Sequence, residues 1–265
     1  MPHGDGASSL QRGKLSRNDL IRDKAYIDGK WIEADGSASI DVDDPFTGEI
    51  IGKAPSVSED QTKAAISSAE KAFPGWAKEL TRHRGAILRR WFDLVMDHQE
   101  DLARLITLEN GKPLKEARAE VAYGAGFIEF YADEAGRMFG ETIPSPVEGR
   151  RLLVEPEPIG VCAAITPWNF PLAMLTRKAA PALAAGCTMV AKPASQTPLS
   201  AYALAVLAEE AGLPAGVLNV ITGKAGMIGG LLTSSPVVRK ISFTGSTEIG
   251  AKLMEASAPS IKRLS

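Results

Sequence analysis

The chain has 265 residues, of which 45% are hydrophobic and 23% charged, and this balance excludes a disordered, collagen-like or coiled-coil protein. Thirty basic and thirty-two acidic side chains give a net charge of −2, so no charge excess favours nucleic acid or an anionic membrane as a partner. Two cysteines, Cys162 and Cys187, are too few for a disulfide framework and indicate a reducing, cytoplasmic location. Both lie in apolar, strand-like runs, where we expect them to be buried as small hydrophobic residues.

The N-terminal residues 1–23 are polar and lack the apolar core of a signal peptide, so they predict a flexible, solvated tail. The longest uncharged run, Pro158 to Thr176, is long enough for a membrane span. Pro167 and Pro171 interrupt it, however, and we exclude a transmembrane helix.

Elements of the N-terminal half follow from local signals. Ala25 to Glu33 alternates around Asp28-Gly29, which predicts a small edge hairpin because both turn residues tolerate positive φ. Ser58 and Gln61 have the spacing of a capping box, which predicts a helix that ends before Pro74-Gly75. Three further helical patterns follow, from about Thr81 to His98, up to Asn110-Gly111, and from Pro113 to about Met138.

The second half changes character. Residues 140–160 are extended and rich in proline, with a turn at Glu148-Gly149, and predict a protruding β-hairpin. From Gly160 onward, short strands with few charges alternate with helical patterns, which indicates βαβ units and a parallel sheet. The predicted fold class is therefore α/β, with a doubly wound, Rossmann-like parallel sheet, an N-terminal helical layer and the protruding hairpin. Ligands of such sheets bind outside the carboxyl ends of the strands.

Three strand ends carry candidate site residues: Pro167-Trp168-Asn169-Phe170-Pro171, Lys192-Pro193-Ala194-Ser195 and Phe243-Thr244-Gly245-Ser246-Thr247. Gly245 permits close backbone approach, and Ser246 opens a helix whose free N–H groups could hold a pyrophosphate, although a plain strand-to-helix turn has the same pattern. Neither the common G-x-G-x-x-G fingerprint nor a P-loop occurs.

Single residues at these ends have two interpretations each. Lys192 could meet a ribose or phosphate oxygen, or be solvated. Asn169 could donate to a developing oxyanion, or belong only to turn chemistry. Arg177, in an otherwise apolar helix with Lys178, could pair with a substrate carboxylate or form a polar stripe. No metal site is expected, and none of the three histidines has the surroundings of a catalytic residue.

The three motifs together resemble the aldehyde dehydrogenase superfamily in sequence, order and spacing, over nearly the whole chain from about Lys24. The stretches ITLENGKPLKEARAEV, FIEFYADEAGRMFGETIP, LTRKAAPALAAGCTMVAKPASQTP and ISFTGSTEIG are similar to its succinate-semialdehyde dehydrogenase branch. The resemblance implies oxidation of an aldehyde through a thiohemiacetal on a cysteine, hydride transfer to a nicotinamide cofactor, and thioester hydrolysis by water that a glutamate activates. It also implies a homo-oligomer, a dimer or tetramer, acting on a small-molecule semialdehyde without nucleic acid or membrane.

The resemblance also implies residue roles. Asn169 matches the oxyanion donor, and Arg177 matches the arginine that holds the distal carboxylate of the substrate. The implied cofactor-binding positions are Thr166, Trp168, Lys192, Pro193, Ala194, Ser195, Gly229, Gly245 and Ser246. Many NAD-preferring relatives have a glutamate where this chain has Ser195, and that charge would repel a 2′-phosphate. We therefore expect NADP to be preferred, with NAD possible.

One departure concerns catalysis. In the family, the nucleophilic cysteine and the general-base glutamate lie beyond the stretch that KRLS resembles, and neither Cys162 nor Cys187 lies in the nucleophile's motif. We therefore expect this chain alone to be inactive and to lack the catalytic domain. The expected division is a tail (1–23), the hairpin and helical part of the cofactor-binding domain (24–139), an oligomerisation hairpin (140–160) and the parallel core (161–265).

Two hypotheses of different class remain open. The chain is either the cofactor-binding part of an NADP-dependent succinate-semialdehyde dehydrogenase, or a short nucleotide-binding module without catalysis. Glutarate semialdehyde is the rival substrate, because it differs by one methylene, and one methylene is worth only about 1 to 3 kcal/mol of discrimination.

Overall fold

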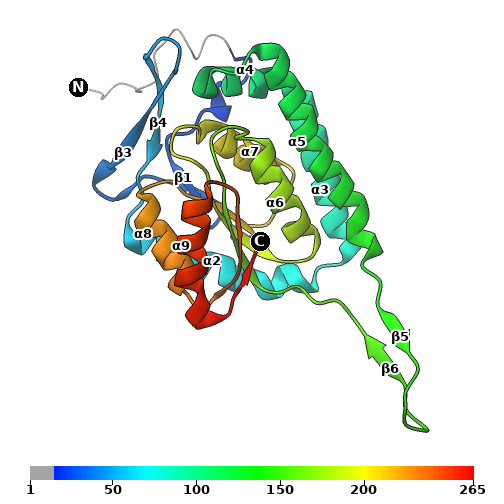
Figure 1. Cartoon of the computed structure of the whole chain (residues 1–265). Coiled ribbons are helices and arrows are strands. Elements are labelled where there is room, and N and C mark those ends of the chain that lie inside the picture. The colour runs from blue at the N-terminus through cyan, green and yellow to red at the C-terminus, as the bar shows by residue number, and fades with distance from the viewer. Residues whose placement is uncertain (1–14) are drawn as a thin grey trace.

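A seven-stranded sheet forms the centre of the computed structural model, which describes residues 15–265 (Figure 1). The strand order is β11-β10-β7-β8-β9-β1-β2, and the first five of these strands run parallel to one another. The five parallel strands are β7 (Val161–Ile165), β8 (Thr188–Lys192), β9 (Leu218–Val220), β10 (Val238–Phe243) and β11 (Arg263–Leu264). This arrangement confirms the predicted α/β class.

The far edge of the sheet is the predicted hairpin. β1 (Ala25–Ile27) and β2 (Lys30–Ile32) pair with each other, and β1 lies antiparallel to β9. Asp28 and Gly29 have φ values of 55° and 69°, as a two-residue turn of this kind requires.

Both faces of the sheet are covered by helices, because each parallel strand sends alternate side chains to opposite sides. In β7, Cys162 and Ala164 join the core under α6 and α7, while Val161 and Ala163 join the core under α2 and α8. These helices, with α9 beside α8, are α2 (Glu59–Lys78), α6 (Ala173–Ala184), α7 (Leu199–Glu210), α8 (Ala225–Ser234) and α9 (Thr247–Ser257).

The predicted helical layer consists of α3 (Thr81–Asp97), α4 (Gln99–Asn110) and α5 (Leu114–Glu134), and it packs against the outer side of α6 and α7 (Figure 1). Trp91 of α3 is 1% exposed, and its indole N–H donates to the Leu204 carbonyl over 3.1 Å. Gly111 ends α4 in the left-handed conformation with φ 75°, as the Asn-Gly pair predicts.

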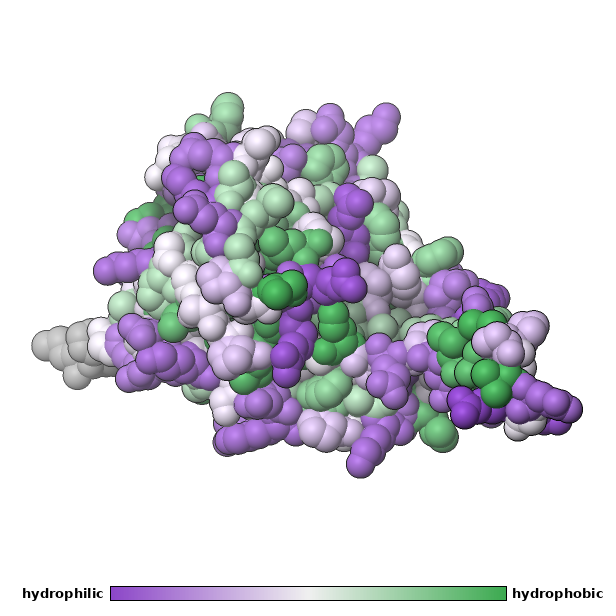
Figure 2. Space-filling view, turned by 60° about the horizontal axis from the view of Figure 1, so that its bottom comes forward, coloured by the Kyte–Doolittle hydropathy of each residue, from purple (hydrophilic) through white to green (hydrophobic). Residues whose placement is uncertain are grey.

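Two hairpins stand apart from the central sheet (Figure 1): β3 (Ser39–Asp43) with β4 (Ile50–Pro55), and β5 (Glu141–Ile143) with β6 (Leu152–Val154). The second is the predicted protruding hairpin. Its apolar side chains are exposed, Leu153 to 72%, and they form a hydrophobic patch at the right of Figure 2. The short 3-10 helices are Asn18–Leu20, Asp35–Ser37, Ala135–Arg137 and Ala258–Ser260.

Two local predictions are wrong. The helix that Ser58 caps, with the predicted capping box, continues through Pro74 to Lys78. The additional turn buries Trp76, whose indole N–H donates to the Leu183 carbonyl over 3.1 Å, and this packing outweighs the helix-breaking tendency of proline.

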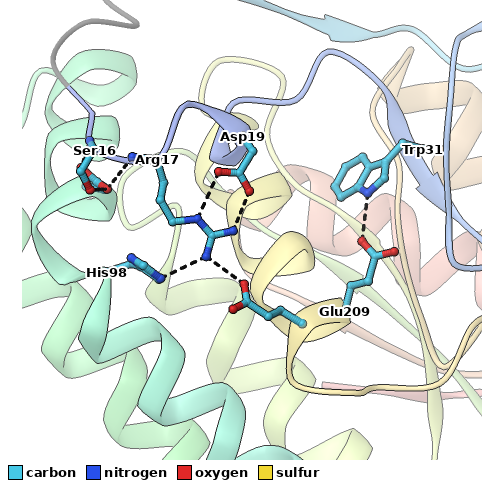
Figure 3. A network of polar contacts seen from close by, with 8 residues as sticks. Ser16, Arg17, Asp19, Trp31, His98 and Glu209 are labelled. Atoms are coloured by element: carbon cyan, nitrogen blue, oxygen red, sulfur yellow. Dashed lines mark hydrogen bonds and ion pairs between the residues drawn. The ribbon is translucent and has the colours of Figure 1, made fainter.

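The predicted solvated tail is also wrong for residues 15–23, while residues 1–14 lie outside the described part. Leu20 is fully buried, and the Arg17 guanidinium donates to Asp19 and to Glu210 of α7 and contacts the His98 ring (Figure 3). The Ser16 and Arg17 backbone N–H groups donate to Asp101 at 2.8 and 3.1 Å. These contacts attach the segment to α4 and α7.

Two buried glutamates close the N-termini of the helices that follow β7 and β8. Glu120 of α5 accepts the N–H groups of Leu172 and Ala173 at 3.0 and 3.3 Å, at the start of α6. Glu109 of α4 accepts the N–H groups of Leu199 and Ser200 at 2.7 and 3.0 Å, at the start of α7. Burial raises the pKa of Glu109 to about 7, although the Ser200 hydroxyl opposes this by donating to the carboxylate.

Lys112 is the counter-charge of Glu120. Their side chains form an ion pair and are 11% and 0% exposed. Lys112→Met should lower the free energy of unfolding by about 3 kcal/mol, since it leaves Glu120 buried without a cation. Urea denaturation followed by circular dichroism measures this. The control is Lys115→Met, which removes an exposed lysine from the same segment. An equal loss of unfolding free energy in the two variants would contradict the assignment of Lys112 as the counter-charge of Glu120. The double variant Lys112→Met with Glu120→Gln should recover part of the loss, because it also removes the buried negative charge.

Candidate functional site

The carboxyl ends of three parallel strands meet at one point. The Thr166 N–H donates to the Lys192 carbonyl over 3.2 Å, which joins the ends of β7 and β8. The Thr244 N–H donates to the Ile165 carbonyl over 3.1 Å, which joins the ends of β10 and β7. The chain leaves β7 toward β8 and β9 on one side and returns to β10 on the other, so this is the switch point at which doubly wound sheets bind ligands.

The turn after β7 presents Asn169. The Trp168 carbonyl accepts the Asn110 side-chain amide at 2.9 Å and the Thr197 hydroxyl at 3.4 Å, and the Asn169 carbonyl accepts the Lys112 ammonium at 2.9 Å. The turn is thus held by its backbone. Within residues 15–265 no group hydrogen-bonds the exposed side-chain amide of Asn169, which remains available as a donor to a ligand.

Lys192 and Thr166 are buried polar residues with bonding capacity left over. The Lys192 side chain donates to the Pro193 carbonyl at 3.2 Å, and no carboxylate of the described chain pairs with it. Burial lowers the pKa of Lys192. The Thr166 hydroxyl oxygen is buried without a partner in the described part of the chain. Each group could therefore donate to an acceptor oxygen of a ligand.

The loop after Lys192 turns outward through half-buried Ala194 and Ser195, while Pro193 stays buried. Ser195 brings a neutral hydroxyl to this rim and no charge. A carboxylate at the same place would bring a negative charge to this loop.

The turn after β10 is the third of the strand-end turns. A Cβ at Gly245 would lie 2.5 Å from the Phe243 ring, so the backbone and ring can be this close only with glycine at that position. Ser246 caps α9 by accepting the Ile249 N–H at 3.4 Å. Gly229, by contrast, is buried in α8, where a Cβ built on it would lie 3.9 Å from the Leu253 side chain of α9, so the structure places it in helix packing and not at a strand end.

Arg177 lies on the exposed side of α6. Its Cζ is 5.5 Å from the centroid of the Phe127 ring, and Nη1 is 3.9 Å from the Met174 sulfur. No carboxylate among the described residues pairs with this guanidinium, so its fork of donors is available to an anion.

Lys178 has a structural role that its sequence pattern does not predict. Its ammonium donates to the hydroxyls of Thr244 and Ser242 at 2.7 and 3.2 Å, and burial lowers its pKa to about 8. It therefore ties α6 to the end of β10. In the sequence, Lys178 is notable only because it and Arg177 are charged residues in an otherwise apolar helix. The fold is needed to show that the Lys178 side chain points inward.

The other chemically active residues lie away from the strand ends. Cys162 and Cys187 are both buried, as predicted. His83 pairs with Glu79, and His98 contacts Arg17. No cluster of histidine, cysteine, aspartate or glutamate in residues 15–265 could hold a metal ion, and no described helix has the length and apolarity needed to cross a membrane.

Comparison with known proteins gives a consistent result. Residues 31–265 match the model of the aldehyde dehydrogenase family. A succinate-semialdehyde dehydrogenase [NADP(+)] of Escherichia coli is 57% identical over 95% of this chain and 52% of its own length. A glutarate-semialdehyde dehydrogenase of Pseudomonas aeruginosa is 57% identical over 93% of this chain and 51% of its own.

Solved structures agree in fold. The crystal structure of an aldehyde dehydrogenase from Brucella melitensis biovar abortus is 54% identical, with a TM-score of 0.94 over 94% of this chain and 52% of that chain. The chain spans about half the length of the curated relatives it matches. The family match, the shared fold and the strand-end motifs together show that this chain belongs to the aldehyde dehydrogenase family.

Proposed function

We propose that this chain is the cofactor-binding part of an NADP-dependent semialdehyde dehydrogenase. The observation that carries the proposal is Lys192, a buried ammonium without a counter-charge in the described chain, at the switch point of the sheet. The unpartnered Thr166 hydroxyl, at the end of the neighbouring strand, is a second buried group that a bound ligand would satisfy. The relatives named above are dehydrogenases of semialdehydes, which supports the same reaction class.

Different residues would bind different parts of the cofactor. Lys192, Ser195 and neighbouring Pro193 and Ala194 would hold the adenosine ribose, and Gly245 and Ser246 at the start of α9 would face the pyrophosphate. Thr166 and Trp168 would line the path toward the nicotinamide. The bound cofactor supplies the hydride acceptor. Gly229 would act through the packing of α8 against α9.

Asn169 would donate its free amide to the aldehyde oxygen as negative charge develops there. Its position depends on the Lys112 and Asn110 contacts to the backbone of the same turn. The nucleophile and the general base would come from outside the 265 residues.

The proposed substrate is succinate semialdehyde, with glutarate semialdehyde as the second candidate because relatives of both kinds are 57% identical to this chain. In both cases Arg177 would bind the distal carboxylate. We further propose a cytoplasmic homo-oligomer in which the exposed apolar side chains of β5 and β6 are covered by another subunit.

Ser195 supports the preference for NADP, because it leaves the Lys192 side of the site without negative charge. The chain should bind NADPH more tightly than NADH in a fluorescence titration. Ser195→Glu should weaken NADPH binding about tenfold or more, through repulsion of the 2′-phosphate.

The control for size is Ser195→Gln, which adds nearly the same volume without the charge. We expect it to weaken NADPH binding much less than Ser195→Glu does. Equal or tighter binding of NADH by the unmodified chain would contradict the preference, and equal losses in both variants would show that volume decides.

Arg177 is tested in a catalytically active protein that contains this chain. Arg177→Ala should raise KM for a carboxylated semialdehyde about 10- to 100-fold, since a hydrogen bond to a charged group contributes roughly 1.5 to 3 kcal/mol. KM for an uncharged aldehyde of the same length should change little, and Arg177→Lys should lie between the two. Equal losses with both aldehydes would show that the arginine is structural.

A further inference from the structure

The two cysteines lie on one face of the sheet, toward the amino ends of their strands. Cys162 in β7 pairs with Met189 in β8, and Cys187 precedes Met189 by two residues, so all three side chains point to the same side. Both thiols belong to the wall of a cavity of about 390 Å³. Glu157 and Arg177, which are exposed, belong to the same wall, so the cavity reaches the surface although each cysteine is only 4% exposed.

Arg84 is a buried cation close to Cys187. The side chain is 4% exposed, and it donates to carbonyl oxygens alone, to Ala184 at 3.0 Å and to Glu79. No carboxylate of the described residues forms an ion pair with it. Its Cζ would lie 3.3 Å from a Cβ built on Gly186, the residue before Cys187. A guanidinium stays protonated when buried, so Arg84 holds a positive charge beside Gly186, the residue that precedes Cys187.

The surroundings shift the pKa values of the two thiols in opposite directions. Hydrogen bonding by the Cys162 thiol, then by the backbone N–H groups of Gly160 and Ile159, together with the Arg84 charge, lowers the pKa of Cys187. The same interaction with Cys187, together with burial, raises the pKa of Cys162. Cys187 is therefore the more readily deprotonated of the two thiols, and the thiolate is the nucleophilic form of cysteine.

We propose that Cys187 and Cys162 form a dithiol site that small hydroperoxides oxidise to an intramolecular disulfide, with Cys187 as the attacking sulfur. The Cys187 thiolate attacks the terminal peroxide oxygen, the O–O bond breaks, and the departing alkoxide takes up a proton to give an alcohol. The Cys162 sulfur then attacks the Cys187 sulfenic acid, the S–O bond breaks, and hydroxide leaves with the thiol proton as water. The two thiols lose two electrons, and the hydroperoxide gains them.

This site is separate from the proposed cofactor site. It uses neither the strand-end turns nor a bound nucleotide. Its cavity is lined by Lys240 and by residues of α6, among them Arg177, the proposed carboxylate-binding residue. The disulfide would join β7 to the residue before β8 and close a loop that contains Asn169 and α6. Loss of cofactor binding and loss of thiol oxidation are therefore independent results.

The test uses the reduced 265-residue chain and tert-butyl hydroperoxide. Intact-mass measurement should show a loss of about 2 Da for the two hydrogens removed, and a non-reducing peptide map should join the peptides of Cys162 and Cys187. In Cys162→Ser, the sulfenic acid on Cys187 should accumulate and be trapped by dimedone. In Cys187→Ser, oxidation of the remaining thiol should be about tenfold slower or more.

Arg84→Met should slow oxidation of Cys187 about tenfold by removing the charge beside the thiolate, and Arg84→Lys should retain most of the rate. Should either arginine variant fail to fold, the serine variants decide, because serine replaces cysteine with nearly the same volume. Failure to form the intramolecular disulfide, disulfides only between chains, or equal rates for the two serine variants would overturn the proposal.

Discussion

The arrangement of the strand ends depends on hydrogen bonds to the free N–H groups of two buried helix N-termini. The first N–H groups of α6 and α7 have no partners within their own helices, and these helix starts are buried under the helical layer. Glu120 and Glu109 satisfy them from α5 and α4. Because the two glutamates belong to neighbouring helices, the positions of α6 and α7, and of the turns that lead into them, are set by one short segment of chain. Lys112 extends the same control to the backbone of Asn169.

The contrast between satisfied and unsatisfied groups separates structure from function in this fold. At α6 and α7 a carboxylate completes the helix start, so no ligand is needed there. At the strand ends the Lys192 ammonium, the Thr166 hydroxyl and the Asn169 amide keep free bonding capacity. Lys192 and Thr166 are buried, and a buried polar group without a partner costs free energy. Their place at the carboxyl ends of the strands, where the sheet topology puts a ligand, is consistent with the proposed binding role.

Sequence reasoning predicts well whatever local signals determine. The Asp28-Gly29 turn, the capping box at Ser58 and the αL residue Gly111 each depend on their immediate neighbours, and the structure has them as predicted. The continuation of α2 beyond Pro74 depends on Trp76 meeting Leu183, more than 100 residues away, and no local signal contains that contact. The same reason hides the inward turn of Lys178 and the caps at Glu109 and Glu120, because each partner lies far along the chain.

The strand-end motifs could be predicted from the sequence for a different reason. In a parallel sheet the carboxyl ends of successive strands share one edge, so residues after β7, β8 and β10 become neighbours whatever the details of packing. The amino ends share the opposite edge by the same rule, and there β7 and β8 bring together Cys162 and Cys187. Composition alone treats two cysteines as inert hydrophobic residues. The pairing of β7 with β8 places them on one side of the sheet, and the buried Arg84 guanidinium lies beside the residue that precedes Cys187.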